Sequence, residues 1–404
     1  MNLSLFIAKR YLISKKSHNA INIITGISVI GICIGTMALV IVLSAFNGIS
    51  DLVFSLYNIF DPDIKITLRE GKTFIPDTIA FGKIKKLSGV IYYTEALQEN
   101  ALLKCNDKQT IATIKGVSDN FVKMTRLDTV IREGDFLLSN DSINYAVLGY
   151  GIARKLNISL TDFMNPLEIY IPKRGKQSFI NPEDAFHVRS VYVSGIFSLN
   201  DDFDYRFALI PLSLARNMLN RNKEVSSVEI GLSDGADKKK VKKEIEKILS
   251  EKNGLWTVKT RYEQNEVLFK TINSEKWWTY LILSFILIIA TFNLIGSITM
   301  LIIEKKKDIQ TLTYLGADKN LIRKIFMKEG MMITFTGALC GLIMGLLVCW
   351  LQMKFKFVPF SEGFVVDAYP VKVMLYDLFL IFLTVMLIGL FASFYSVQVF
   401  AKKI

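Results

Sequence analysis

Residues 20–46 decide the fold, and they read AINIITGISVIGICIGTMALVIVLSAF. The run has no charged residue and exceeds the roughly 20 apolar residues that a helix needs to cross a hydrocarbon core about 30 Å thick. Three more uncharged apolar runs follow, at Trp277–Ile303, Met331–Leu351 and Leu378–Phe400. Hydrophobic residues make up 51% of the chain, a larger share than in most soluble proteins. The sequence therefore predicts four membrane-spanning helices.

A cleavable secretory signal is the alternative for the first run, because basic residues precede it at Lys9, Arg10, Lys15 and Lys16. The run is too long for the apolar region of a signal peptide, however, and no small-residue cleavage site follows it. We therefore interpret the run as a retained anchor.

Basic residues near the helix ends predict the orientation, because cytoplasmic loops carry an excess of Lys and Arg. Such residues gather before the first run, in the link 304–330 and at the C-terminus, whereas the link 352–371 is mixed. With four spans, both termini are expected in the cytoplasm of a bacterial cell, and residues 47–276 outside it. This clustering also accounts for the net charge of +12, so we expect membrane lipid and not nucleic acid as a partner.

The outer region alternates strand and helix patterns, which is typical of an α+β domain. A length of about 230 residues favours two lobes over one. Strands are predicted at Asp63–Leu68, Gln109–Val117, Leu167–Ile171, Arg189–Phe197, Arg206–Ile210 and Ser227–Leu232, and helices at Asp77–Leu87, Gly151–Leu156, Leu212–Leu219 and Asp237–Ser250.

Two common enzyme motifs are missing from the sequence. There is no GxxxxGK[ST] phosphate loop and no HExxH zinc motif. The four cysteines form no CxxC pair, which argues against a structural zinc site. We therefore expect no catalytic residue, no metal and no cofactor bound by this chain.

Glycines recur every four residues in two of the apolar runs. Residues four apart lie on one face of a helix, and small side chains there let another helix approach closely. The partner helix is either in the same chain or in a second subunit. The glycines expected to pack in this way are Gly31, Gly35, Gly337, Gly341 and Gly345.

The link between the second and third runs predicts a short amphipathic helix. Ile309, Leu312 and Leu315 recur at helical spacing and form one apolar face. Gly316 suits the position just after the helix, and Asp318 can cap the next one. This helix is either a connector lying on the membrane surface or a docking site for a cytoplasmic partner. Residues 3–16 are also amphipathic and predict an interfacial helix that leads into the first span.

Several stretches resemble the lipoprotein-releasing ABC transporter permeases of the LolC/LolE family. They are Phe6–Leu12 (FIAKRYL), Ile27–Gly35 (ISVIGICIG), Val42–Gly48 (VLSAFNG) and the connector Glu304–Gly330. The order of one span, a large outer domain and three spans also agrees with that family. The wider grouping includes MacB-like efflux permeases, which usually carry a fused ATPase, and FtsX-like permeases, whose outer domains are smaller.

The resemblance implies that two permeases, either copies or paralogues, pair with two copies of a separate ATPase that binds ATP and Mg²⁺. This chain would not itself be an enzyme. Movement of the outer domains would lift lipoproteins from the outer leaflet of the inner membrane and pass them to a periplasmic carrier. The residues expected to couple to the ATPase are Lys307, Asp308, Ile309, Leu312, Leu315 and Gly316.

Two further sites are expected from the resemblance. A β-hairpin called the hook would recruit the carrier, and we place it at roughly residues 173–187 with a basic residue at its base. The hook residues are Arg174, Phe179, Pro182, Phe186 and Arg189. The lipoprotein cavity is placed on the first and second spans, at Val40, Leu43, Phe46, Trp278, Ile282 and Phe285.

Two other functions remain open at this point. One is an efflux or other force-transmitting permease with the same plan, and the other is a non-transporting regulator of a periplasmic partner. In either case the expected division of the chain is 1–19 interfacial helix, 20–46 first span, 47–276 periplasmic domain, 277–303 second span, 304–330 coupling segment, 331–351 third span, 352–371 link, 372–400 fourth span and 401–404 tail.

Overall fold

The computed structural model describes residues 4, 6–8, 19–76, 78–140, 143–161, 164–173, 185–250, 255–360 and 368–400. The expected tail 401–404, most of the interfacial helix and the centre of the expected hook lie outside these residues. The chain divides into two compact units. The helical unit is drawn from Met1–Leu52, Lys270–Phe360 and Val366–Ile404, and the sheet unit from Val53–Phe269.

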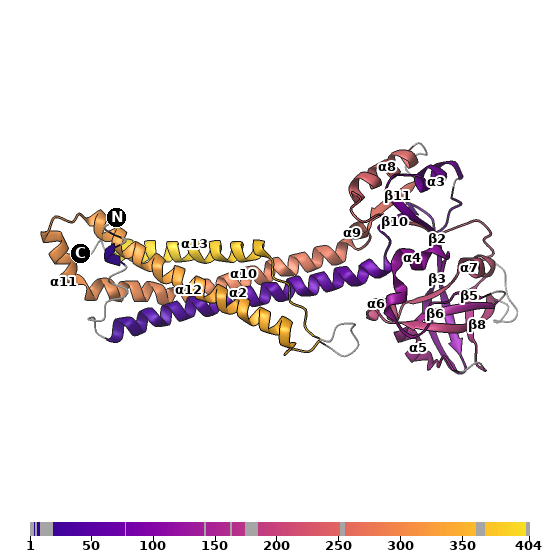
Figure 1. Cartoon of the computed structure of the whole chain (residues 1–404), viewed down its shortest axis with the longest axis horizontal. Helices are drawn as coiled ribbons and strands as arrows, with labels where there is room; N and C mark the ends of the chain where they lie inside the picture. The colour runs from indigo at the N-terminus through magenta and orange to yellow at the C-terminus, as the bar shows by residue number, and fades with distance from the viewer. Residues whose placement is uncertain are drawn as a thin grey trace. The chain divides into compact units, whose positions relative to one another are not determined.

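Four long helices dominate the helical unit and run alongside one another in Figure 1. They are α2 (Asn19–Phe60), α10 (Glu266–Glu304), α12 (Lys319–Phe355) and α13 (Leu375–Phe400). Each is long and apolar enough to cross a membrane. Their buried apolar side chains form one cluster to which all four helices contribute.

Two of these helices extend beyond the apolar runs. Helix α2 continues to Phe60 and α10 begins at Glu266, although the runs end at 46 and begin at 277. Residues 47–60 contain no proline, so the helical hydrogen bonds of the backbone can continue beyond the end of the apolar run. Residues 47–60 and 266–276, expected in the outer domain, are therefore helical extensions of the first and second spans.

The glycines of α12 are occupied by packing within the chain. A Cβ atom on Gly341 would lie 2.5 Å from the carbonyl oxygen of Cys33, and one on Gly337 or Gly345 would collide with side chains of α2. Gly35 is covered by Leu287 of α10, whereas no described residue lies within 4 Å of a Cβ atom built on Gly31. Of the two alternatives, contact within the chain explains the α12 glycines.

The sheet unit is built on one mixed sheet with strand order β11-β1-β10-β2-β3-β9-β6-β8-β4, while β5 pairs with β6 and β7 with β2 and β8. The strands are β1 Ile64–Leu68, β2 Val90–Cys105, β3 Lys108–Val117, β4 Ile131–Gly134, β5 Ser139–Asn140, β6 Ile143–Gly149, β7 Leu167–Pro172, β8 Phe186–Phe197, β9 Phe207–Pro211, β10 Ser227–Leu232 and β11 Trp256–Thr260. The helices are α3 Thr78–Lys85, α4 Asn120–Thr125, α5 Tyr150–Leu156, α6 Asp201–Asp204, α7 Leu212–Met218, α8 Lys238–Ser250 and α9 Arg261–Gln264.

Two separate apolar cores lie along this sheet. One is formed by β1, β10 and β11 with α3 and α8, and it contains Ile64, Val228 and Ile245. The other lies under α5 and α7 and contains Leu97 and Ile169. Strand β2 joins them, because its first half pairs with β10 and its second half with β7.

A buried ion pair lies where the strands of the two cores meet. Lys115 Nζ of β3 is 3.0 Å from the carboxylate of Glu229 on β10, and both side chains are at most 2% exposed. The ammonium also lies over the rings of Phe60, at 4.8 Å, and Phe121, at 4.3 Å. Burial lowers the pKa of Lys115, and the charge of Glu229 opposes that shift.

Asp204 of α6 should make the stability of the sheet unit depend on pH. Burial raises its pKa to about 6, although Leu199 N and Ser198 Oγ donate hydrogen bonds that favour the carboxylate. The folded chain therefore binds a proton more tightly than the unfolded chain, and this group destabilises the fold as pH rises through 6. We expect lowering the pH from 7 to 5 to add about 1 kcal/mol to the free energy of unfolding.

The variant Asp204→Asn isolates this effect, because the amide oxygen still accepts from Leu199 N but does not titrate. Urea unfolding of both proteins at pH 5 and pH 7 is the measurement. Wild type should gain about 1 kcal/mol of stability relative to the variant on going from pH 7 to pH 5. Identical pH profiles for the two proteins would contradict the assignment to Asp204.

Candidate functional site

The coupling segment forms the expected helix and turn. Helix α11 spans Lys306–Tyr314, and Gly316 follows with a φ of +93°. The amide of Ala317 donates to the carbonyl of Leu312 at 3.0 Å, which closes the end of the helix. Asp318 then caps α12 by accepting a 2.9 Å hydrogen bond from the amide of Leu321. The positions of Gly316 and Asp318 are thus explained by local backbone geometry.

The exposed apolar surface of this segment differs from the expected one. Ile309 is only 1% exposed and belongs to the core cluster of the helical unit, with Ile322 and Phe326. Leu312 is half-buried, whereas Tyr314 and Leu315 are 88% and 80% exposed. The prediction that Ile309 takes part in an open docking face is wrong, because α11 packs that side chain against the spans. The exposed apolar pair is Tyr314 and Leu315.

The other coupling residues lie on the same short helix. Lys307 and Asp308 are both exposed, and Asp308 forms a 3.4 Å ion pair with Lys305 one turn earlier. The sequence did not point to Tyr314, because the predicted apolar face consisted only of aliphatic residues at helical spacing. Its position next to Leu315 before a helix-ending glycine was the available signal.

The described part of the expected hook is the base of a β-hairpin. Strands β7 and β8 pair antiparallel, with Pro172 opposite Phe186 and Ile169 opposite Arg189. Phe186 is half-buried, with its ring edge-on to that of Tyr170 at 6.1 Å, and Arg189 is exposed. The remaining three expected hook residues lie outside the described residues: Arg174, Phe179 and Pro182.

The expected lipoprotein cavity does not form one continuous surface. Val40 and Leu43 are 0% and 1% exposed in the core of the four helices, so the prediction that they line an open cavity is wrong. Phe46 is half-buried. The α10 residues are well exposed and lie on one side of that helix: Trp278 at 66%, Ile282 at 60% and Phe285 at 62%. An apolar groove that the sequence did not predict lies between α10 and α13, with a volume of about 410 Å³.

A buried polar cluster joins three of the long helices. Lys276 Nζ of α10 lies 2.9 Å from Asp377 Oδ2 of α13 and 2.8 Å from Asn47 Oδ1 of α2. Asn47 Nδ2 donates to Asp377 Oδ2 at 2.6 Å. Asn47 and Asp377 are 3% and 5% exposed. Sequence reasoning missed the cluster, although each of its members directly borders an apolar run.

Gly48 follows Asn47 of that cluster and lies against the link before α13. A Cβ atom on Gly48 would lie 2.2 Å from the carbonyl oxygen of Pro370. The amide of Lys372 also donates to the carbonyl of Ser44 at 2.9 Å. The stretch Ser44–Gly48 therefore holds the start of α13 against α2.

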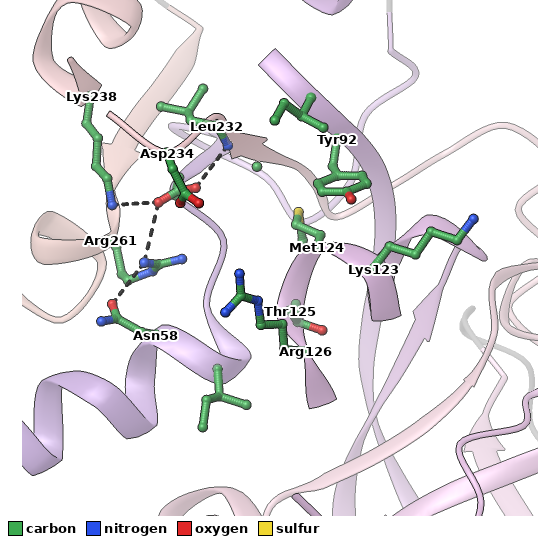
Figure 2. Close-up of a pocket in the computed structure, with 14 residues that line it drawn as sticks. Asn58, Tyr92, Lys123, Met124, Thr125, Arg126, Leu232, Asp234, Lys238 and Arg261 are labelled. Atoms are coloured by element: carbon green, nitrogen blue, oxygen red, sulfur yellow. Dashed lines mark hydrogen bonds and ion pairs between the residues drawn. The ribbon is translucent and has the colours of Figure 1, made fainter. Parts of the chain in front are cut away.

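A polar cavity of about 560 Å³ lies within the sheet unit (Figure 2). Its wall is organised by Asp63, which precedes β1. Asp63 forms ion pairs with Lys238 at 2.6 Å and Arg261 at 3.4 Å, and accepts from the amide of Leu232 at 2.9 Å. Burial raises the pKa of Asp63, but these donors outweigh it and hold the pKa below the usual range. No sequence pattern pointed to this cavity, because its residues come from six separate elements.

Two family models match the chain. The model described as the MacB-like periplasmic core domain matches residues 25–248, and the FtsX-like permease C-terminal model matches residues 280–403. Together they cover the sheet unit up to residue 248, which leaves out β11 and α9, and most of the described spans.

Curated relatives match over nearly the full length. The chain is 23% identical to the lipoprotein-releasing system transmembrane protein LolE of Haemophilus influenzae, over 100% of this chain and 98% of the relative. It is 25% identical to the corresponding LolC protein of Neisseria meningitidis, over 86% and 82%. It is also 28% identical to an uncharacterized membrane protein of Buchnera aphidicola, over 100% and 97%.

Proposed function

The chain belongs to the LolC/LolE family of permeases, and on that premise we propose that it is the permease subunit of an ABC transporter that releases lipoproteins. Two permeases, either copies of this chain or the chain and a paralogue, would assemble with two copies of a separate ATPase. That ATPase would bind ATP and Mg²⁺. Lipoproteins would leave the outer leaflet of the inner membrane and pass to a periplasmic carrier.

The observation that carries this proposal is the exposed end of α11. Tyr314 and Leu315 present apolar surface at the turn between two membrane-spanning helices. Large exposed apolar side chains of this kind favour a protein contact. In the proposed orientation both termini and this turn face the cytoplasm, where the ATPase is.

The burial of Ile309 supports transmission of movement from that contact. Because Ile309 packs in the same cluster as side chains of all four long helices, α11 is fixed to the spans rather than lying loosely on the membrane. Packed interiors resist continuous deformation, so a displaced α11 would move the spans with it. An energy source is needed, since each CH₂ withdrawn from lipid costs about 0.8 kcal/mol.

The sheet unit would receive the lipoprotein and the carrier in the periplasm. We assign its two apolar cores to two lobes of an α+β domain. The hairpin of β7 and β8, with exposed Arg189 at its base, is our candidate for the hook. Exposed Trp278, Ile282 and Phe285 on α10 would contact acyl chains or the second permease.

The test is a pull-down of the tagged full chain from mild detergent, with partners identified by mass spectrometry. Leu315→Asp places a charge on the exposed turn and should weaken association with the ATPase by about 30-fold or more, as for a central contact residue. Ile111→Asp is the matched control, because Ile111 is 74% exposed on β3 of the sheet unit. The control should retain the ATPase.

The co-purifying proteins separate the competing functions. Acylated lipoproteins together with a soluble ATPase support lipoprotein release. An ATPase with an efflux adaptor or a cell-wall hydrolase would keep the architecture but overturn the substrate. If wild type brings down no ATPase under conditions that preserve complexes, the transporter proposal itself fails.

A further inference from the structure

The polar cavity of the sheet unit carries an excess of positive charge. Among the described residues, four basic and two acidic side chains line it. Asp63 is already neutralised by Lys238 and Arg261, which lie 2.6 and 3.4 Å from it. The remaining acidic side chain is Asp234, which is exposed. The remaining basic ones are Arg126 and Lys123, and the ammonium of Lys123 points away from the other labelled side chains in Figure 2. The cavity is therefore suited to an anion.

Arg126 is held in an unusual backbone conformation. Its φ of 55° and ψ of 29° place it in the left-handed region at the end of α4, where its amide donates to the carbonyl of Val122. Glycine or asparagine adopts this conformation at least cost, and a long side chain there is disfavoured. Three of the four other non-glycine residues with positive φ in the described chain are asparagines. A strained arginine at a helix end is a reason to look for a function.

The strained conformation directs the guanidinium of Arg126 into the cavity, as Figure 2 shows. Among the described residues it makes no hydrogen bond or ion pair. Across the cavity, Arg261 is fixed by Asn58 Oδ1 at 2.8 Å and the carbonyl oxygen of Asp61 at 2.9 Å. One guanidinium is thus anchored in the wall and the other is free to bind. Pairs of guanidinium groups are well suited to the oxygens of a phosphate.

We propose that this cavity binds the phosphate group of a phosphate monoester, with Arg126 as the principal ligand-binding residue and Arg261 as its anchored partner. A monoester carries close to two negative charges at neutral pH and three terminal oxygens, which suits a cavity lined by more basic than acidic side chains. Tyr92 and Met124 lie side by side as a less polar part of the wall in Figure 2, and the organic part of the ligand lies against them. The site requires nothing of the proposed lipoprotein release and stands or falls separately from it.

A phosphate monoester has two sources, a soluble ester or the headgroup of phosphatidic acid. The full chain in detergent is titrated calorimetrically with inorganic phosphate, with glycerol 3-phosphate and with phosphatidic acid presented in the same micelles. Phosphatidylcholine in micelles is the lipid control, since its phosphate is a diester neutralised by choline. Saturable binding of glycerol 3-phosphate or inorganic phosphate assigns a soluble ligand. Saturable binding of phosphatidic acid alone assigns the lipid headgroup.

The decisive variant is Arg126→Asn. Asparagine tolerates the left-handed conformation, so the melting temperature should stay the same or rise, while phosphate affinity falls about tenfold or more through loss of a charged hydrogen bond. Arg154→Gln is the matched control, because Arg154 is an exposed arginine near the end of α5, away from the cavity. It should bind as wild type does.

Three results would overturn the proposal. They are no saturable binding of any phosphate probe by wild type, unchanged affinity in Arg126→Asn, or an equal loss in Arg154→Gln. Arg126→Lys is a further check, since lysine keeps the charge without the planar fork. It should recover part of the affinity lost in Arg126→Asn, and a lysine variant as weak as the asparagine variant would also count against the site.

Discussion

Replacing Lys115 by methionine is expected to lower the free energy of unfolding of the sheet unit by about 3–5 kcal/mol, because it leaves the carboxylate of Glu229 buried without its cation. Glu229 is 0% exposed, and the hydroxyl of Ser227, 3.3 Å from Oε1, is its remaining side-chain donor among the described residues. The loss is a large fraction of the stability of a typical domain.

Urea titration of the full chain in detergent, with protease resistance of the sheet unit as the readout, measures this effect. Lys108→Met is the matched control, because Lys108 is an exposed lysine on the same strand. This control should change the free energy of unfolding by no more than about 0.5 kcal/mol. A Lys115→Met midpoint close to that of the control would show that the buried pair does not stabilise the sheet.

The double variant Lys115→Met with Glu229→Leu tests the reason for the loss. Replacing both charges with apolar side chains of similar size removes the desolvation penalty along with the attraction, and such replacements are often neutral or stabilising. We therefore expect the double variant to recover most of the stability lost in Lys115→Met. If it is less stable than the single variant, then contacts of the charged pair, including the rings of Phe60 and Phe121, contribute more than the charges cost.

The strands that sequence reasoning found are those with a simple apolar pattern. All six predicted strands are present, as β1, β3 and β7 to β10, with ends within a few residues of those expected. Strand β2 was missed, since its stretch ALQENALLK resembles a helix in composition. Its partners change from β10 to β7 along its length, so its burial follows no single alternation. Tertiary pairing, not local preference, makes this stretch a strand.

Residues of the candidate sites were predictable only where local rules apply. Gly316 and Asp318 follow from the requirements of helix ends, and the structure places them as expected. Ile309 and Leu315 share the same pattern, yet one is buried and the other exposed, because the direction in which α11 packs is set by distant helices. Arg126 gave no signal at all, since its backbone conformation and its cavity exist only in the folded sheet unit.

Replacing Lys276 by methionine is expected to destabilise the helical unit by about 2–3 kcal/mol, through the unpaired charge left on Asp377. The estimate lies at the lower end of the range for buried pairs, because the Lys276 side chain is 25% exposed whereas that of Asp377 is 7% exposed. Among the described residues, Asn47 is then the side chain that still donates to the carboxylate, at 2.6 Å. Thermal loss of helicity in detergent, followed by circular dichroism, is the measurement.

Two further variants test whether the charge of Lys276 is what stabilises the helical unit. Lys319→Met, at an exposed lysine in the same unit, should leave the melting temperature nearly unchanged. Adding Asp377→Asn to Lys276→Met should restore part of the loss, because the neutral amide no longer needs a cation. Since the cluster ties α2, α10 and α13 together, its loss should also make Ser44–Gly48 more accessible to hydrogen exchange. Unaltered melting and exchange in Lys276→Met would mean that apolar packing alone holds these three helices together.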